Sequence, residues 1–138
     1  MSLEQENILV VQRLCDIVNN RDYDAMDELF ADSFVDRNPA WIVDNLDELK
    51  NIIREAHQAL NQDITQNDIF ASNDRVVVTI AFNGKHIGSF LGIPPTNKPV
   101  SWTSIEIYRF DENGKIVERW VQADTAGLMR QLGVEIPS

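Results

Sequence analysis

The chain has 138 residues, a formal net charge of -10, two histidines and one cysteine. This length fits a single domain whose core needs no cross-links, and the lone Cys15 excludes both an internal disulfide and a thiolate metal cluster. The excess of carboxylates repels phosphate backbones and anionic lipid surfaces, so we expect neither nucleic acid nor a membrane as a partner.

The longest apolar runs, such as residues 76–78, are too short to cross a bilayer. The first residues are acidic, whereas a secretory leader begins with a basic segment followed by an apolar one. We therefore expect a cytoplasmic protein. Cys15 lies among Val11, Leu14 and Val18, and this position predicts a small buried core residue.

In the N-terminal part of the chain, apolar side chains recur every three or four positions, which is the pattern of amphipathic helices. The pattern predicts helices over residues 5–20, from Asp22 or Tyr23 to Phe30, and from Asn45 or Leu46 to Leu60. A short strand is predicted at residues 33–38, where Pro39 ends it because proline has no backbone N–H to donate. Trp41 follows in a connection. His57 lies at the edge of the third apolar face, and we assign it no role.

After the third helix the apolar period changes to two, the pattern of strands. Strands are predicted at residues 64–72, 75–82, 100–110 and 115–123, with an extended piece at 86–90, a proline-rich loop at 92–99 and a short helix at 125–132. Helices followed by consecutive strands with short turns predict an α+β domain with an antiparallel sheet. Such a sheet curls around three helices into a cone whose mouth holds a small ligand.

The last strand carries a row of side chains that differs from an ordinary core row. Because strand side chains alternate, Glu118, Trp120, Gln122 and Asp124 point to one face, and this mixture of polar and aromatic groups suits a pocket wall. Two interpretations of Asp124 remain open. It either belongs to a site or caps the helix at residues 125–132 by accepting a hydrogen bond from a free backbone N–H.

Several segments together resemble one known family. They are residues 34–39, 84–98, 105–110 and 114–120, Asp124, and residues 131–133. In register over nearly the whole chain, they resemble the SnoaL-like polyketide cyclases of the NTF2-like superfamily. The resemblance implies one SnoaL-like domain over residues 1–138, a cone-shaped α+β barrel with a deep apolar pocket, and a homodimer formed through the outer sheet face.

The resemblance also implies a chemistry. Asp124 lies where family members carry a general acid/base for an intramolecular aldol cyclisation, which needs neither a metal nor an organic cofactor. His86 lies where a histidine lines the same pocket. Two residues depart from the family pattern, because Arg37 stands where members often have histidine and Asn97 where they often have glycine. Asparagine tolerates the left-handed backbone that glycine allows there.

An aspartate can deprotonate a carbon acid only if burial raises its pKa, so Asp124 needs apolar walls. We expect Trp41, Phe90, Trp102 and Trp120 to supply the walls and substrate contacts, and Arg37 to anchor a substrate carboxylate or stabilise an enolate. His86 is expected to donate a hydrogen bond to the enolate oxygen. The substrate is then a small apolar carbonyl compound, and the reaction a cyclisation or an isomerisation.

Plainer interpretations stay open beside these. Trp102 and Trp120 fit an ordinary core, and His86 fits a bond to loop backbone. Arg37 and Asp124 could form an ion pair, which would keep the pKa of Asp124 low. The sequence has no HExxH, GxSxG, GxGxxG or P-loop motif, so we expect no metal site, serine hydrolysis or nucleotide binding. Two non-enzymatic functions remain as alternatives: a small-molecule-binding module and a dimeric scaffold.

Overall fold

The computed structural model describes residues 1–39, 41 and 43–136. Within these residues the structure contains three helices, five strands and one 3-10 helix. In chain order the elements are α1 (Leu3–Asn19), η1 (Tyr23–Glu28), β1 (Phe30–Arg37), α2 (Leu46–Leu60), β2 (Asp63–Ser72), β3 (Arg75–Lys85), β4 (Pro99–Phe110), β5 (Ile116–Ala123) and α3 (Thr125–Gln131).

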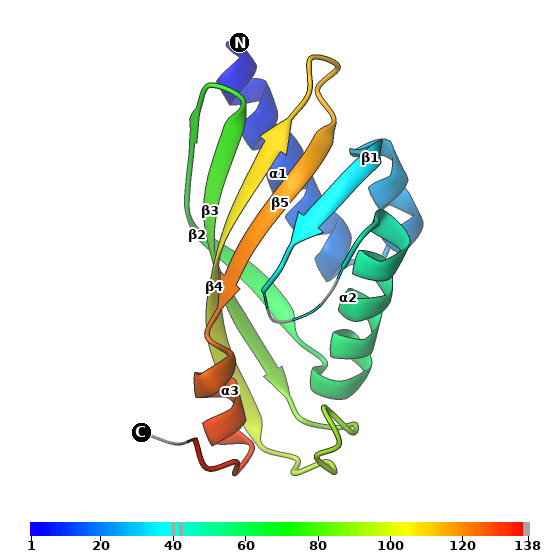
Figure 1. The fold of residues 1–138 in the computed structure, drawn as a ribbon. Coiled ribbons are helices and arrows are strands. Elements are labelled where there is room, and N and C mark those ends of the chain that lie inside the picture. The colour runs from blue at the N-terminus through cyan, green and yellow to red at the C-terminus, as the bar shows by residue number, and fades with distance from the viewer. Residues whose placement is uncertain (40, 42, 137–138) are drawn as a thin grey trace.

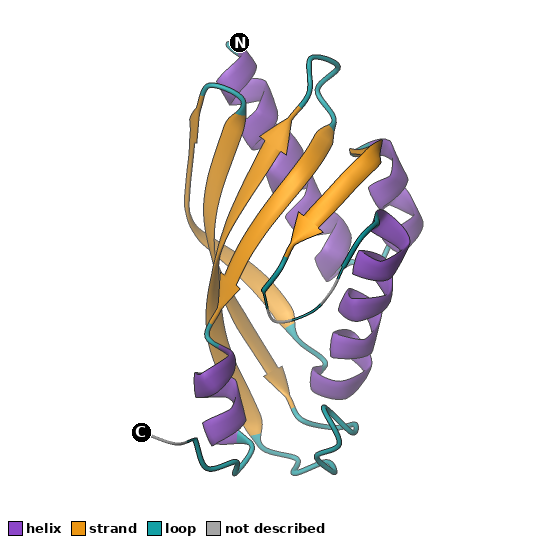
Figure 2. Ribbon diagram, in the orientation of Figure 1, coloured by secondary structure: helices purple, strands orange, loops and turns teal. Residues whose placement is uncertain are grey.

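The strands form one curved, open sheet in the order β1-β5-β4-β3-β2. All neighbouring pairs are antiparallel except β1 and β5, which run parallel. Helices α1 and α2 lie against one side of the sheet, and α3 follows β5 at the far end (Figures 1 and 2). The α+β class and the curved sheet packed on N-terminal helices confirm the prediction from the sequence. None of the helices in the described ranges combines the length and apolarity needed to cross a membrane.

Local caps explain where the helices begin and end. Ser2 and Gln5 form a capping box at the start of α1, and the Asn45 side chain accepts a hydrogen bond from Glu48 N at the start of α2. Asn61, in the left-handed conformation with φ of 41°, ends α2.

The predicted second helix is shorter than its apolar pattern indicates. It is a single 3-10 segment, η1, and Phe30 already belongs to strand β1. Phe30 is buried and pairs with Ile116 of β5. This pairing between distant parts of the chain overrides the local helical pattern, because the strand partner satisfies the backbone groups that the helix would otherwise use.

The two faces of β4 do not follow the usual pattern of apolar residues inside and polar residues outside. Trp102, Ser104, Glu106 and Tyr108 are buried on the inner face, whereas Ile105 on the outer face is 55% exposed. On β3, Val76, Val78 and Ile80 also point inward and pack against α1 and α2. The concave face therefore contains both the main core and a group of polar side chains.

The segment between β3 and β4 is a folded loop rather than the predicted extended piece. Ile87 and Gly88 both donate backbone hydrogen bonds to the carbonyl oxygen of Ala59 near the end of α2, and only an isolated bridge joins Phe90 to Ile93. Asn97 has a φ of 57°, so the left-handed backbone expected at that position is present. The loop closes one end of the space between α2 and the sheet.

Candidate functional site

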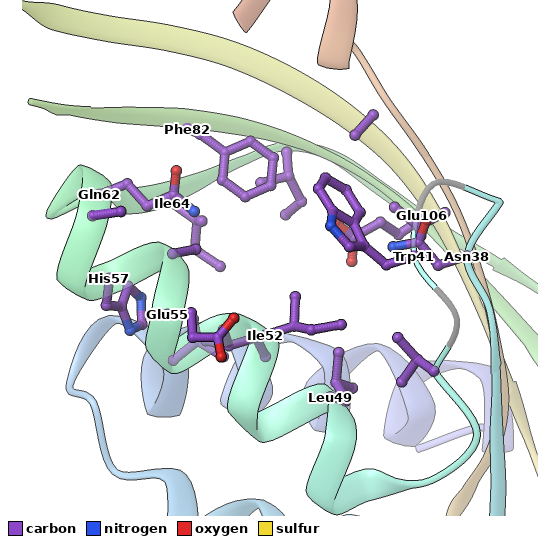
Figure 3. A pocket seen from close by; sticks show the side chains of 18 of the residues that line it. Asn38, Trp41, Leu49, Ile52, Glu55, His57, Gln62, Ile64, Phe82 and Glu106 are labelled. Carbon is purple, nitrogen blue, oxygen red and sulfur yellow. The ribbon is translucent and has the colours of Figure 1, made fainter. Parts of the chain in front are cut away.

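A cavity of about 470 Å³ lies between α2 and the concave face of the sheet. Figure 3 shows Ile52 and Glu55 on the α2 side and Phe82 on the sheet side, with Trp41 and Glu106 at another edge. Most of the lining is apolar or aromatic. Such walls exclude water and suit an apolar small molecule.

Three of the predicted binding residues line this cavity: Trp41, Phe90 and Trp102. The Trp102 indole stacks on Phe82 with ring centroids 4.3 Å apart, and its Nε1 donates a hydrogen bond of 3.0 Å to Gln62 Oε1. Both contacts fix the ring. Trp102 is therefore a rigid wall of the cavity and a member of the core at the same time.

A buried cluster of charges lies at the cavity wall formed by β4 and β5. Arg119 donates to Glu106 Oε1 through Nη2 at 3.0 Å and to Asp36 Oδ2 through Nη1 at 2.7 Å. Tyr108 donates its hydroxyl to Glu106 Oε1 and Ser104 donates to Glu106 Oε2, each at 2.7 Å. Glu106, Tyr108 and Arg119 line the cavity, whereas Asp36, whose side chain has no exposed surface, contacts it only through Arg119.

The two carboxylates of this cluster differ in acidity. Burial raises the pKa of Asp36, and the Arg119 guanidinium only partly opposes this effect. Burial would also raise the pKa of Glu106, but the charge of Arg119 and the hydrogen bonds from Ser104, Tyr108 and Arg119 outweigh it and lower that pKa. Glu106 is therefore a stable anion and a weak base.

His57 of α2 is a second buried polar group in the lining. Its Nδ1 lies 2.6 Å from the hydroxyl of Tyr23. Burial lowers the pKa of His57 to about 4, and the nearby Arg21 acts in the same direction while Asp63 opposes it. The imidazole is thus neutral at neutral pH, and as a neutral ring it can accept the Tyr23 hydrogen bond.

Acid should therefore destabilise the protein through His57. Unfolded chains protonate this ring below its ordinary pKa of 6.5, whereas the folded protein resists protonation down to about 4. The unfolded state binds more protons in that window, so stability falls as pH falls, by about 2 kcal/mol between pH 7.5 and 5. Urea unfolding at both pH values measures this loss. His57→Gln should reduce the loss by a similar amount, and an unchanged loss in the variant would contradict the assignment.

Asp124 lies outside the cavity. Its side chain is exposed, and its Oδ1 accepts a hydrogen bond of 2.9 Å from Gly127 N, so it caps α3. Ala123, its neighbour, belongs to the lining, but Asp124 does not. The prediction that this carboxyl is enclosed by aromatic walls is wrong. The capping interpretation is correct because β5 ends at Ala123 and the free N–H groups of α3 follow directly.

His86 also lies outside the cavity, although it is completely buried. Its Nδ1 accepts a hydrogen bond of 3.2 Å from Thr96 N and lies 3.0 Å from Thr96 Oγ1. Its backbone bonds to Asn97 and Lys98 across the same loop. The prediction that His86 lines the pocket is wrong; its contacts hold the loop together.

Arg37 and Trp120 point to the outer face of the sheet, away from the cavity. Arg37 Nε donates to Glu118 Oε2 at 2.9 Å, and no ion pair with Asp124 forms. Trp120 stacks under Arg75, whose guanidinium carbon lies 4.8 Å from the ring centroid. The row of Glu118, Trp120 and Gln122 was predicted as a pocket wall, but the alternate residues Arg119, Val121 and Ala123 line the cavity instead.

Sequence reasoning missed the charged cluster. The inward row of β4 was visible as an alternation of aromatic and polar residues, and this row was the available signal for Glu106 and Tyr108. Asp36 and Arg119 gave no such signal, because they are 83 positions apart and meet only through the parallel pairing of β1 with β5. Among the described residues, no three His, Cys, Asp or Glu side chains gather closely enough to hold a metal ion.

Comparison with known structures places this architecture among bacterial proteins of one fold. AclR from Streptomyces galilaeus, a proposed hydroxylase, is 24% identical, with 97% of this chain and 99% of that chain covered and a TM-score of 0.87. IdmH from Streptomyces antibioticus, a proposed polyketide cyclase, is 25% identical, with coverage of 91% and 96% and a TM-score of 0.80.

A proposed SnoaL-like polyketide cyclase from Jannaschia sp. CCS1 is 18% identical, with coverage of 99% and 97% and a TM-score of 0.87. At 18% and 24% identity the likeness concerns the fold alone. A search of curated protein sequences finds no match. The sequence profile of the SnoaL-like polyketide cyclases matches residues 8–132, which is most of the sequence. The chain therefore belongs to the SnoaL-like polyketide cyclase family.

Proposed function

We propose that this protein is a cyclase-type enzyme that binds a small apolar carbonyl compound in the cavity and moves a proton without a metal or organic cofactor. The observation that carries the proposal is the cavity itself. It combines about 470 Å³ of largely apolar space with one charged cluster in its wall. This combination suits a ligand with an apolar body and a single polar reacting end.

Arg119 is the proposed polarising group. Its guanidinium lines the cavity, and Glu106 and Asp36 hold it in place from two sides. Three of its five N–H groups account for the bonds to Asp36, Glu106 and Tyr108, and no further acceptor contacts Nη1 or Nη2 in the described part of the chain. A remaining N–H can donate to a substrate carbonyl oxygen and stabilise the negative charge that develops on an enolate.

Glu55 is the proposed acid/base. It lines the cavity on the α2 side (Figure 3), and its side chain takes part in no hydrogen bond or ion pair with another described residue. Glu106, in contrast, is occupied by Ser104, Tyr108 and Arg119. Glu55 is exposed in the ligand-free protein, and a bound apolar ligand would cover it. The covered carboxylate could then accept a proton from the carbon beside the carbonyl and return it to the alkoxide that ring closure forms.

Exchange of carbon-bound hydrogen tests both roles. In D₂O, the protein should accelerate hydrogen–deuterium exchange beside the carbonyl of 2-tetralone, measured by NMR. Glu55→Gln should reduce this acceleration about a hundredfold, because it removes the proton acceptor. Asp124→Asn should keep the rate within about threefold and barely change stability, because asparagine caps a helix about as well as aspartate. A rate that collapses in Asp124→Asn but persists in Glu55→Gln would return the acid/base role to Asp124.

A non-catalytic binding module is the second candidate. One observation favours it: the aspartate expected to transfer the proton caps a helix on the surface instead. Ketone binding with no exchange above the buffer rate would support this candidate and contradict the enzymatic one.

We also propose that a second copy of the chain covers the outer face of the sheet. A cross-strand row of Phe70, Val77, Ile107 and Trp120 runs over that face, and Phe70 and Ile105 are 57% and 55% exposed. An exposed apolar patch on a sheet is a common site of association.

Light scattering after size-exclusion chromatography measures the proposed dimer. Ile105→Asp should convert the protein to a monomer, because it places a charge inside the covered face. Ile87→Asp is the matched control, since Ile87 is also exposed, at 47%, but belongs to the loop after β3. A wild-type protein that is monomeric at all concentrations tested contradicts the proposal.

A further inference from the structure

More negative than positive side chains surround the cavity. The lining contains the carboxylates of Glu55 and Glu106 and one guanidinium, Arg119. His57 also lines it but is neutral at neutral pH, because burial lowers its pKa to about 4. Asp36 adds a third carboxylate directly behind Arg119. Carboxylates therefore outnumber the single cation.

Asp36 and Glu106 together neutralise the positive charge of Arg119. Asp36 Oδ2 accepts from Nη1 at 2.7 Å, and Glu106 Oε1 accepts from Nη2 at 3.0 Å. The side chain of Arg119 is only 12% exposed and that of Asp36 is not exposed at all, so water screens these contacts little. To an incoming ligand, Arg119 offers hydrogen-bond donors but no unbalanced positive charge.

This balance matters for ligands that carry their own charge. A carboxylate entering the cavity loses its hydration and meets an excess of negative charge, with no unpaired cation among the described lining residues to compensate. A ketone or ester of the same shape loses far less hydration and can still accept a hydrogen bond from Arg119. Asp36 is the member of the cluster that creates the excess without touching the ligand.

We propose that Asp36 is a specificity-determining residue: by pairing with Arg119 from behind the cavity wall, it restricts the site to uncharged carbonyl compounds and excludes carboxylates. The inference rests on the proposed function, because it assumes that the cavity is the binding site. Removing the negative charge of Asp36 while keeping its shape would leave Arg119 balanced by Glu106 alone, so that a bound carboxylate no longer faces the additional charge.

Two near-isosteric probes separate the inference from the function on which it rests: 2-acetylnaphthalene, which is neutral, and 2-naphthoate, which is anionic at pH 7.5. Isothermal titration calorimetry gives the affinity of the whole chain for each. The wild-type protein should bind the ketone at least about tenfold more tightly than the carboxylate. Failure to bind the ketone contradicts the proposed function, whereas equal affinities for both probes contradict only the role of Asp36.

Asp36→Asn tests the residue itself. It should strengthen binding of 2-naphthoate about tenfold and leave the ketone affinity within about threefold. Asp32→Asn is the matched control, because it removes the same charge from an exposed position on the same strand. Should Asp36→Asn fold poorly, the same titrations can be made with Asp36→Ser, which also removes the charge and leaves space for a water molecule to bind Arg119. A selectivity that is equal in wild type and the Asp36 variant overturns the proposal.

Discussion

Replacing Arg119 by Met should lower the free energy of unfolding by about 3–5 kcal/mol, because it leaves two buried carboxylates without their cation. Asp36 is 6% exposed and Glu106 is 5% exposed, so neither group can recover its hydration. Urea unfolding at pH 7.5 measures the loss. The loss should be smaller at pH 5, since unpaired buried carboxylates take up protons and become neutral.

Arg109→Met is the matched control for this prediction. Arg109 also bonds to a glutamate, Glu118, at 2.9 Å, but its side chain is 36% exposed on the outer face of the sheet. Exposed pairs of this kind contribute about 1 kcal/mol or less. Similar losses in the two variants would mean that the cluster of Asp36, Glu106 and Arg119 is far better solvated than its burial indicates.

Replacing Gly84 by Ala should also destabilise the protein strongly, by about 3 kcal/mol. A Cβ added at this position would lie 2.2 Å from the carbonyl oxygen of Leu60 and 2.9 Å from Cα of Gln62. Both neighbours are backbone atoms at the junction of α2 and β2, so no side-chain rotation relieves the clash. The junction must move away from β3, and the hydrogen bond from Trp102 Nε1 to Gln62 Oε1 is then lost.

Two measurements check the Gly84 prediction. Thermal unfolding should show the loss of stability, and tryptophan fluorescence should report the released Trp102. Gly114→Ala is the control, because Gly114 has a φ of 76° but no atom within 4 Å of an added Cβ. It should cost only the strain of a left-handed alanine, about 1 kcal/mol. A Gly84 variant as stable as the Gly114 variant would contradict the predicted clash.

The positions of the predicted site residues show which features of the site the apolar periodicity of the sequence indicates and which it does not. Trp41, Phe90 and Trp102 line the cavity; Trp102 lies on the inner face of β4, whereas Trp41 and Phe90 lie in loops. Arg37 and Trp120 point the other way. Alternation indicates that Trp120 and Arg119 lie on opposite faces of β5, but it does not indicate which face the helices cover.

The resemblance to a family likewise predicted the fold better than the site. It correctly implied the curved α+β architecture and the left-handed backbone at Asn97. It also implied that Asp124 and His86 lie in the pocket, whereas one caps α3 and the other holds the loop after β3. A shared fold fixes the course of the backbone, while the direction of a single side chain depends on its own hydrogen-bond partners.

By itself the sequence determined the order and approximate limits of most helices and strands, because periodicity, caps and turns act over a few neighbouring residues. It also offered the helix cap at Asp124 as one of two interpretations, since an aspartate before a short helical segment can accept a hydrogen bond locally, and the structure decided between them. Only the tertiary structure decided which face of the sheet is concave, where the cavity lies and that Asp36 meets Arg119. These features depend on contacts between residues far apart in the chain, and no local pattern specifies the partner across such a distance.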